Sequence, residues 1–183
     1  MNRHVKEFSV NGFKVVIDYD PFSYGHSPRE WALSKWYGVD NNAPSDLILD
    51  EDGKIDPSCD ELKDKFWFKV YKYEHSAVSF SLVSADKWDS SFFGIIAISK
   101  DEVTTKDEAM KRIEAELDLY TNWCNGEVYG YRIYDESNPN IEVDSCWDYF
   151  SIDECEADAK DMVICYAEQK KKDSVRFWAN NAD

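Results

Sequence analysis

The stretch Thr105–Gly126, TKDEAMKRIEAELDLYTNWCNG, decides the fold. It begins with the spacing Thr105-x-x-Glu108, which is typical of a capping box that satisfies free N–H groups at the start of a helix. Apolar residues then recur every three or four positions, and Asn125-Gly126 supplies a left-handed stop. The stretch therefore predicts one amphipathic helix with a single buried face. That face is expected to carry Ala109, Ile113, Leu117, Tyr120 and Cys124.

Strand-forming segments lie on both sides of this helix. In residues 8–17, apolar residues alternate around Asn11-Gly12, which is the signal for a type I′ hairpin turn. The pattern predicts further strands at residues 66–73, 78–82 and 92–98 before the helix, and at residues 127–135 and 141–146 after it. Residues 31–37 fit either a short helix or an edge strand.

A second helix follows Ser151-x-x-Glu154, another capping box, and is expected to run to about Lys172. Its inner face would carry Ile152, Cys155, Ala159, Val163 and Tyr166. Hairpin-like neighbouring strands with two such helices predict an α+β fold, in which an antiparallel sheet has two amphipathic helices packed on one face. We expect residues 1–183 to form a single α+β domain with an acidic irregular excursion at about residues 38–65.

The composition combines strong acidity with many aromatic residues. The chain has 37 acidic and 21 basic residues, a formal net charge of -16, and 15% Phe, Trp and Tyr. Disordered acidic tails lack aromatic residues, so this chain is expected to fold. A strongly negative surface repels nucleic acid and anionic membranes and attracts basic partners. We therefore expect neither direct nucleic-acid binding nor membrane binding.

The cysteine pattern bears on metal sites and on the compartment. Five cysteines are present, and no pair has the C-x-x-C spacing, which argues against a zinc site and a redox motif. No apolar stretch approaches the roughly 20 residues that span a bilayer. We expect a cytoplasmic protein with free thiols and without a metal or cofactor.

The acidic residues concentrate in two fields. Residues 40–64 contain nine acids and two bases, and residues 135–161 contain ten acids and one base. In the first helix, Asp107 with Lys111 and Glu108 with Arg112 have the spacing of ion pairs, whereas the acids of the second helix have no such partners. Carboxylates on rigid elements can present the charge pattern of a phosphate backbone. The acids expected to bind a partner are Asp50, Glu51, Asp52, Asp56, Asp60, Glu61, Asp64, Asp153, Glu154, Glu156, Asp158 and Asp161.

Motifs for catalysis or calcium binding are incomplete. His75 could act with Ser76 or Ser90 and Asp89, but no Gly-x-Ser-x-Gly elbow supports a nucleophile. Cys146 has no nearby basic residue to lower its pKa, so a buried small apolar residue is the stronger interpretation. An EF-hand aligned on Gly53 lacks its first and last ligands.

Two blocks of motifs resemble a family of small proteins encoded by bacteriophages and other mobile elements. The first contains Tyr71-Lys72-Tyr73-Glu74-His75-Ser76 and Trp88-Asp89-Ser90. The second contains Gly126-Glu127-Val128-Tyr129-Gly130-Tyr131 and Asp144-Ser145-Cys146-Trp147. The resemblance covers most of residues 66–160 and implies a mobile-element origin and an α+β fold, without an activity to transfer. Its motif residues without an assigned role are His75, Trp88, Asp89, Ser90, Tyr129, Asp144, Cys146 and Trp147.

Charge and resemblance together predict a non-enzymatic, phage-encoded anti-defence protein. It would bind and inhibit a basic, nucleic-acid-binding host defence enzyme of the CRISPR-associated or restriction type, by nucleic-acid mimicry. This would take place in the cytoplasm of an infected or lysogenic bacterium. Two alternatives stay open: an accessory adaptor that modulates another host protein, and a small enzyme that uses His75, Asp89 or Cys146.

Overall fold

The computed structural model describes residues 3–21, 26–38, 45–84 and 90–180. The chain packs into two compact units, one formed by residues 1–25 with 126–183 and the other by residues 26–125. The described part of each unit contains a four-stranded antiparallel sheet and one long helix. The α+β class is therefore confirmed, but the strands form two sheets instead of the expected one, and each helix packs on its own sheet. The single domain over residues 1–183 stays a prediction.

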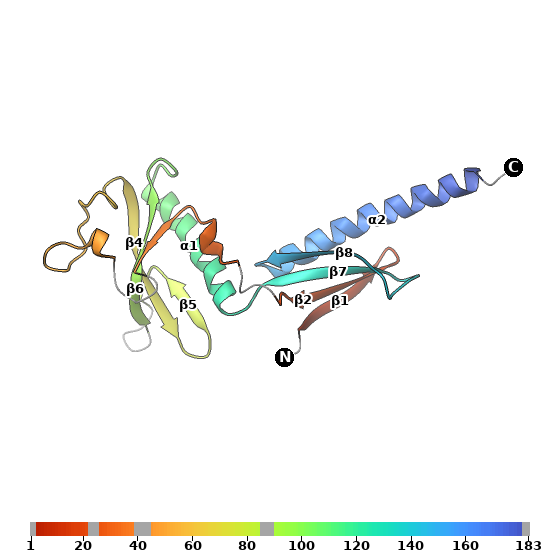
Figure 1. The fold of residues 1–183 in the computed structure, drawn as a ribbon, viewed down its shortest axis with the longest axis horizontal. Helices are drawn as coiled ribbons and strands as arrows, with labels where there is room; N and C mark the ends of the chain where they lie inside the picture. The colour runs from red at the N-terminus through yellow and green to blue at the C-terminus, as the bar shows by residue number, and fades with distance from the viewer. Residues whose placement is uncertain (1–2, 22–25, 39–44, 85–89, 181–183) are drawn as a thin grey trace. The chain divides into compact units, whose positions relative to one another are not determined.

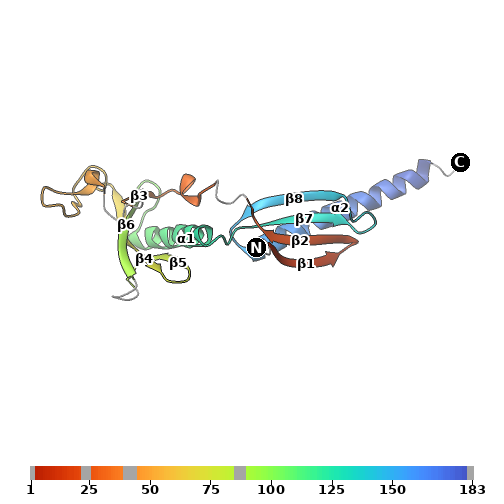
Figure 2. The same ribbon diagram turned by 60° about the horizontal axis from the view of Figure 1, so that its bottom comes forward.

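The first unit is built from the two ends of the chain. Its sheet has the order β1 (His4–Val10), β2 (Phe13–Tyr19), β7 (Tyr129–Asp135) and β8 (Glu142–Tyr149), as Figure 2 shows. Asn11 and Gly12 both have positive φ, 53° and 81°, as the type I′ turn requires. The expected hairpin is confirmed, and β2 then pairs with β7, more than 100 residues later in the sequence.

Helix α2 (Ile152–Asn180) covers one face of this sheet and continues past the ends of its strands (Figure 1). The helix ends later than the expected Lys172. Its buried residues stop at Ala167, and residues 168–177 are all exposed. Residues 168–177 therefore bury little surface. The core contains Phe13, Val15, Ile17, Tyr131, Ile133, Cys155, Ala159, Val163 and Ala167.

The second unit has the strand order β3 (Lys35–Tyr37), β6 (Ser90–Ser99), β4 (Lys65–Glu74) and β5 (Val78–Ser81). Part of residues 31–37 thus forms an edge strand, which settles the alternative that the sequence left open. Helix α1 (Lys106–Cys124) packs on one face through Ala109, Ile113 and Leu117, the expected stripe.

Strand β6 is buried on both faces. A register shift opposite Val70 and Tyr71 interrupts its alternation. As a result, Phe93, Ile96 and Ile98 face α1. Ile95 and Ala97 face the acidic segment, residues 45–64, on the other side of the sheet. This explains why residues 92–98 form a continuous apolar run, since both sides of the strand are covered.

The start of α1 differs in detail from a capping box. The Thr105 side chain accepts the N–H of Glu108 at 3.1 Å, as expected. The Glu108 carboxylate, however, accepts both the N–H and the O–H of Thr104, at 3.0 and 3.1 Å. Within the described chain, the expected ion pairs of Glu108 with Arg112 and of Asp107 with Lys111 are absent. Gly126 has φ 73°, which confirms the predicted left-handed stop.

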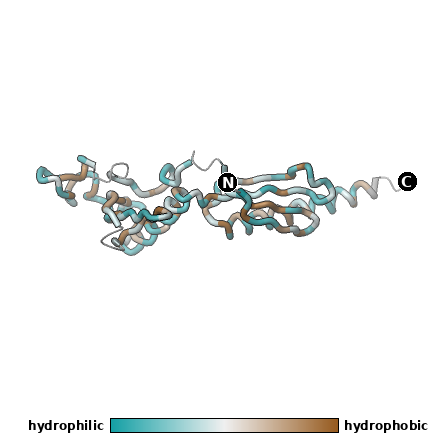
Figure 3. Tube along the Cα trace, turned by 90° about the horizontal axis from the view of Figure 1, so that it is seen from below, coloured by the Kyte–Doolittle hydropathy of each residue, from teal (hydrophilic) through white to brown (hydrophobic). Residues whose placement is uncertain are grey.

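Hydrophobic and hydrophilic residues are interspersed along the described trace (Figure 3). Within residues 3–21, 26–38, 45–84 and 90–180, no helix combines the length and the apolar character needed to cross a membrane.

Candidate functional site

The structure describes residues 45–64 of the acidic segment of the second unit, and residues 39–44, where the expected excursion begins, lie outside the described residues. A short 3-10 helix (Asp46–Ile48) and a bridge between Leu49 and Ile55 shape it. Ile48 and Leu62 are 0% and 1% exposed and pack against the sheet face opposite α1. The carboxylates are therefore mounted on a segment with its own small core.

Two of these carboxylates hold turns. Asp50 Oδ1 accepts the N–H groups of Asp52 and Lys54 at 3.0 and 2.7 Å, beside Gly53 at φ 75°. Asp56 Oδ1 accepts the N–H and O–H of Ser58 at 2.8 and 2.7 Å, which lowers the pKa of Asp56. Such Asx-type turns are common in loops, so these acids contribute to local structure. Among the described residues, no group of three or more His, Cys, Asp or Glu could hold a metal ion.

Glu61 links this segment to the edge strand. Its carboxylate lies 2.7 Å from Lys35 Nζ and accepts the Tyr37 hydroxyl at 2.8 Å. The hydrogen bond from Lys35, followed by that from Tyr37, lowers the pKa of Glu61. Burial, reinforced by the Glu61 carboxylate, raises the pKa of Tyr37. Glu61 therefore has a structural role that a partner would have to displace.

Four more of the acids expected to bind a partner lie in this segment, and all four are exposed. Asp52 is exposed and lies 3.7 Å from the equally exposed Lys54, a separation typical of a weak surface pair. Glu51, Asp60 and Asp64 are exposed. Within the described chain, they have no ion pair or side-chain hydrogen bond. These four acids form what we call the outer carboxylate set.

The acids of α2 divide in the same way. Glu156 forms ion pairs with Lys6 at 2.6 Å and Lys160 at 2.7 Å, and the latter spans one helical turn. Asp158 accepts hydrogen bonds from the hydroxyls of Tyr131 and Tyr149. The expectation that the acids of this helix lack ion-pair partners at i,i+4 spacing is therefore wrong for Glu156, whereas Asp158 has tyrosine partners instead. Sequence spacing could not place Lys6 and the tyrosines, which come from other strands. Among the acids of α2 that were expected to bind a partner, Asp153, Glu154 and Asp161 are exposed and have no such contact within the described chain.

The motif residues fall in both units. His75 is exposed in the turn after β4, and Ser90 is the first residue of β6, while Trp88 and Asp89 lie outside the described residues. The other four, Tyr129, Asp144, Cys146 and Trp147, lie on the paired strands β7 and β8 of the first unit. The structure thus brings the Gly-Tyr and Cys-Trp motifs together.

The catalytic candidates that the structure describes do not form a hydrogen-bonded group. In the described chain, the His75 side chain makes a ring contact with Tyr73, with centroids 6.5 Å apart, and no hydrogen bond to Ser76 or Ser90. Cys146 is exposed, not buried as the sequence suggested, because β8 is an edge strand. The buried thiol is that of Cys155, whose pKa burial raises to about 12. That value makes Cys155 a poor nucleophile.

A polar cluster that the sequence did not reveal lies on the sheet face opposite α2. Asp18 on β2 is 7% exposed. One of its oxygens lies 3.5 Å from His4 Nδ1, and the other forms an ion pair with Arg132 on β7. A buried polar role for Asp18 and Arg132 could have been suspected from the sequence, because each is a charged residue within an apolar strand pattern. Their pairing, 114 residues apart, could not.

This cluster forms one wall of a cavity of about 500 Å³ on that face. The cavity is lined by Arg3, His4, Val16, Asp18, Tyr19, Pro21, Arg132 and Trp147.

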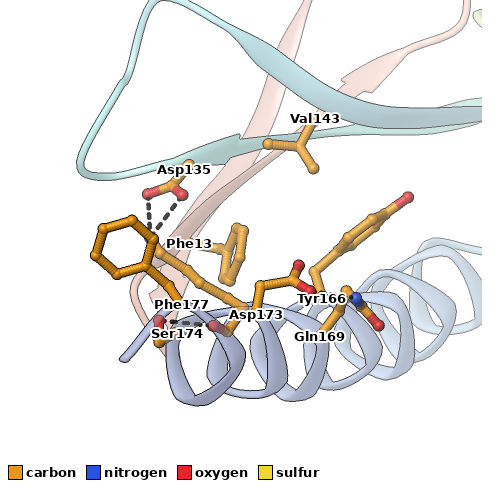
Figure 4. Close-up of a pocket in the computed structure, with 9 residues that line it drawn as sticks. Phe13, Asp135, Val143, Tyr166, Gln169, Asp173, Ser174 and Phe177 are labelled. Carbon is orange, nitrogen blue, oxygen red and sulfur yellow. Dashed lines mark hydrogen bonds and ion pairs between the residues drawn. The ribbon is translucent and has the colours of Figure 1, made fainter. Parts of the chain in front are cut away.

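A second cavity of the first unit, about 480 Å³, lies between α2 and the end of the sheet where Phe13, Asp135 and Val143 meet (Figure 4). Its apolar wall includes Phe13, Val143 and the exposed Phe177. Lys170 Nζ, 2.9 and 2.6 Å from the two Asp135 oxygens, ties the helix to the sheet here. The Lys170 and Ser137 hydrogen bonds lower the pKa of Asp135 to about 2.

Comparisons of the chain with protein-family models, curated proteins and solved structures give no match. The resemblance to phage-encoded proteins stays a prediction, and the function has to be argued from the geometry of this chain.

Proposed function

We propose that the protein binds the nucleic-acid-gripping surface of a basic host protein and competes with nucleic acid there. The outer carboxylate set supports this proposal most directly. Glu51, Asp52, Asp60 and Asp64 are exposed, while Ile48 and Leu62 anchor the segment that carries them. An anchored array of charges loses less conformational entropy on binding than a flexible acidic tail does.

Helix α2 offers a second array in the other unit. Glu154 and Asp161 are seven residues apart, so they lie on the same side of the helix, about 10 Å apart along its axis. Asp153 adds a third exposed carboxylate at the helix start. Each array can engage Lys and Arg side chains that normally contact phosphates, independently of how the two units are placed.

The partner class follows from charge and from the resemblance. A net charge of -16 disfavours direct contact with nucleic acid and favours a basic protein. Under the phage resemblance, that protein is a host defence enzyme of the CRISPR-associated or restriction type, and inhibition takes place in the bacterial cytoplasm. We propose binding and no catalysis.

The experiment is affinity capture from bacterial lysate with the immobilised full chain, followed by mass spectrometry and elution with duplex DNA. We expect a nucleic-acid-binding protein that DNA displaces and that dissociates as salt rises. The test variant removes the outer carboxylate set (E51Q, D52N, D60N, D64N). The matched control removes four exposed acids near α1 (D101N, D107N, E114Q, D118N), which leaves the same net charge.

The two variants separate a specific surface from general acidity. The proposal predicts that the first variant loses the captured protein and the control retains it. Equal loss in both would mean that net charge alone acts. Capture that neither salt nor DNA disturbs would contradict the proposal and favour the adaptor alternative.

A further inference from the structure

The cavity beside Asp18 is a local exception in an acidic protein. Two arginines, Arg3 and Arg132, and the imidazole of His4 line it, against the single carboxylate of Asp18. Both oxygens of that carboxylate are already engaged, one by His4 and the other by Arg132. Among the described lining residues, two guanidinium groups therefore stand against one carboxylate, and that carboxylate already binds Arg132.

Arg132 is held in place more firmly than a surface arginine. Asp18 binds one end of the guanidinium, and the group lies 5.9 Å from the ring of Tyr134. Its Nε is buried and has no hydrogen-bond acceptor. An arginine fixed in this way loses little rotamer freedom on binding an anion, and it retains donors beyond those that Asp18 satisfies.

Trp147 supplies a flat apolar wall. Its indole lies so close to Gly130 that a Cβ there would come within 2.1 Å of Cε3. The strand is bulged at this point, because Tyr131 pairs with Cys146 and Tyr129 pairs with Tyr149, which leaves two residues of β8 opposite Gly130. Asp148, the second of them, has φ 69°, and its N–H is bonded to Asp20 Oδ2 at 3.3 Å.

A bulge, a positive φ outside glycine and a buried acid that fixes them are features that recur at binding sites. Here they hold Trp147 over Gly130, where it lines the same cavity as Arg3, His4 and Arg132. Val16, opposite Arg132 on the neighbouring strand β2, adds an apolar residue to the cavity lining. The cavity of about 500 Å³ is within the size range of small-molecule sites.

We propose that this cavity binds a small molecule in which an anionic group is joined to a flat ring. The anion is held by Arg132 and Arg3, with His4 beside them, and the ring stacks on Trp147. A nucleoside monophosphate and an aromatic carboxylate share this chemistry. The site is formed within the first unit and is independent of the proposed protein partner.

The test is isothermal titration of the full chain with three probes: inorganic phosphate, AMP and 4-hydroxybenzoate. We expect AMP or 4-hydroxybenzoate to bind, and AMP more tightly than phosphate alone. A preference for AMP identifies the anion as phosphate, and a preference for 4-hydroxybenzoate identifies it as carboxylate. Absence of binding for all three probes at millimolar concentration would overturn the proposal.

Variants assign the two halves of the site. Arg132→Gln should lower the affinity for the probe that binds by about tenfold or more, the effect of losing a hydrogen bond to a charged group. Trp147→Leu should lower the affinity for AMP by about tenfold, the effect of losing one stacked ring. It should leave any binding of inorganic phosphate unchanged. Lys14→Gln, on the same sheet face outside the cavity lining, is the matched control.

Arg132→Gln removes a partner of the buried Asp18, so its fold is checked by circular dichroism. Trp147 is only half-buried, and Trp147→Leu therefore tests the site even if Arg132→Gln unfolds. Equal binding of AMP by wild type and Trp147→Leu would contradict the stacking role. Equal loss in Lys14→Gln would show nonspecific attraction and contradict the site.

Discussion

The indole of Trp147 packs over Gly130 on the open face of the first sheet and fills the space that a side chain at residue 130 would occupy. A Cβ on residue 130 would lie 2.1 Å from Cε3 of the indole and 2.8 Å from the carbonyl oxygen of Cys146. Contacts below 3.0 Å require a shift of the neighbouring group. The absence of a side chain at residue 130 therefore sets the position of Trp147.

Gly130→Ala should displace the indole and destabilise the first unit by about 1–3 kcal/mol, the usual cost of overpacking. Urea unfolding measures the change. Trp147→Leu in the same chain should recover part of the loss, because a smaller side chain then faces the new methyl group. Additive effects of the two substitutions would contradict the contact.

Local pattern predicted the elements of this fold well. The turn at Asn11-Gly12, the cap at Thr105 and the apolar stripes of both helices all depend on residues within a few positions of one another. The division into two sheets depends on the pairing of β2 with β7 across the whole second unit. No local signal in a single sequence carries that pairing.

The candidate sites could likewise be predicted only where they depend on residues close together in the sequence. Exposure of Glu51 and Asp64 could be expected from their acidic, turn-rich surroundings. The i,i+4 pair of Glu156 with Lys160 is visible in the sequence, but the contacts of Glu156 with Lys6 and of Asp158 with Tyr131 could not be expected, because these partners come from distant strands. The cavity beside Asp18 was missed for this reason too, since His4, Asp18 and Arg132 meet only after the sheet has formed.

Thr105→Ala should destabilise α1 and the core that it covers. The Thr105 side chain accepts the N–H of Glu108, and losing such a cap costs about 1 kcal/mol. Thermal unfolding of the full chain measures the effect. Thr105→Ser, which retains the hydroxyl, is the matched control and should behave like wild type. An equal loss in the serine variant would instead assign the effect to the methyl group.

The last turns of α2 should exchange their amide hydrogens faster than the rest of the helix. Cys155, Ala159 and Val163 are 0% exposed, whereas residues 168–177 are all exposed. Helix segments that bury little surface open at low free-energy cost. Hydrogen-exchange mass spectrometry should show protection that falls after Ala167. Uniform protection through Phe177 would contradict this and indicate that another surface covers the end of the helix.

Acid should weaken the attachment of α2 to its sheet through Asp135. The pKa of this carboxyl is lowered to about 2, first by the hydrogen bond from Lys170 and then by those from Ser137. A carboxyl with a lowered pKa in the folded state contributes stability that is present above its ordinary pKa of 3.8 and is lost as the pH falls through about 2. The loss should therefore lie between about pH 4 and pH 2.

Asp135→Asn should remove this part of the pH dependence, because the amide does not titrate. Urea unfolding at a series of pH values compares the variant with wild type. Lys170→Met should shift the acid transition toward higher pH, since the first cause of the low pKa is gone. Lys171→Met, which changes the neighbouring lysine, should leave the transition in place. If Lys170→Met and Lys171→Met give the same profile, the contact between Lys170 and Asp135 does not control the acid response, and the attachment of α2 must depend on its apolar face alone.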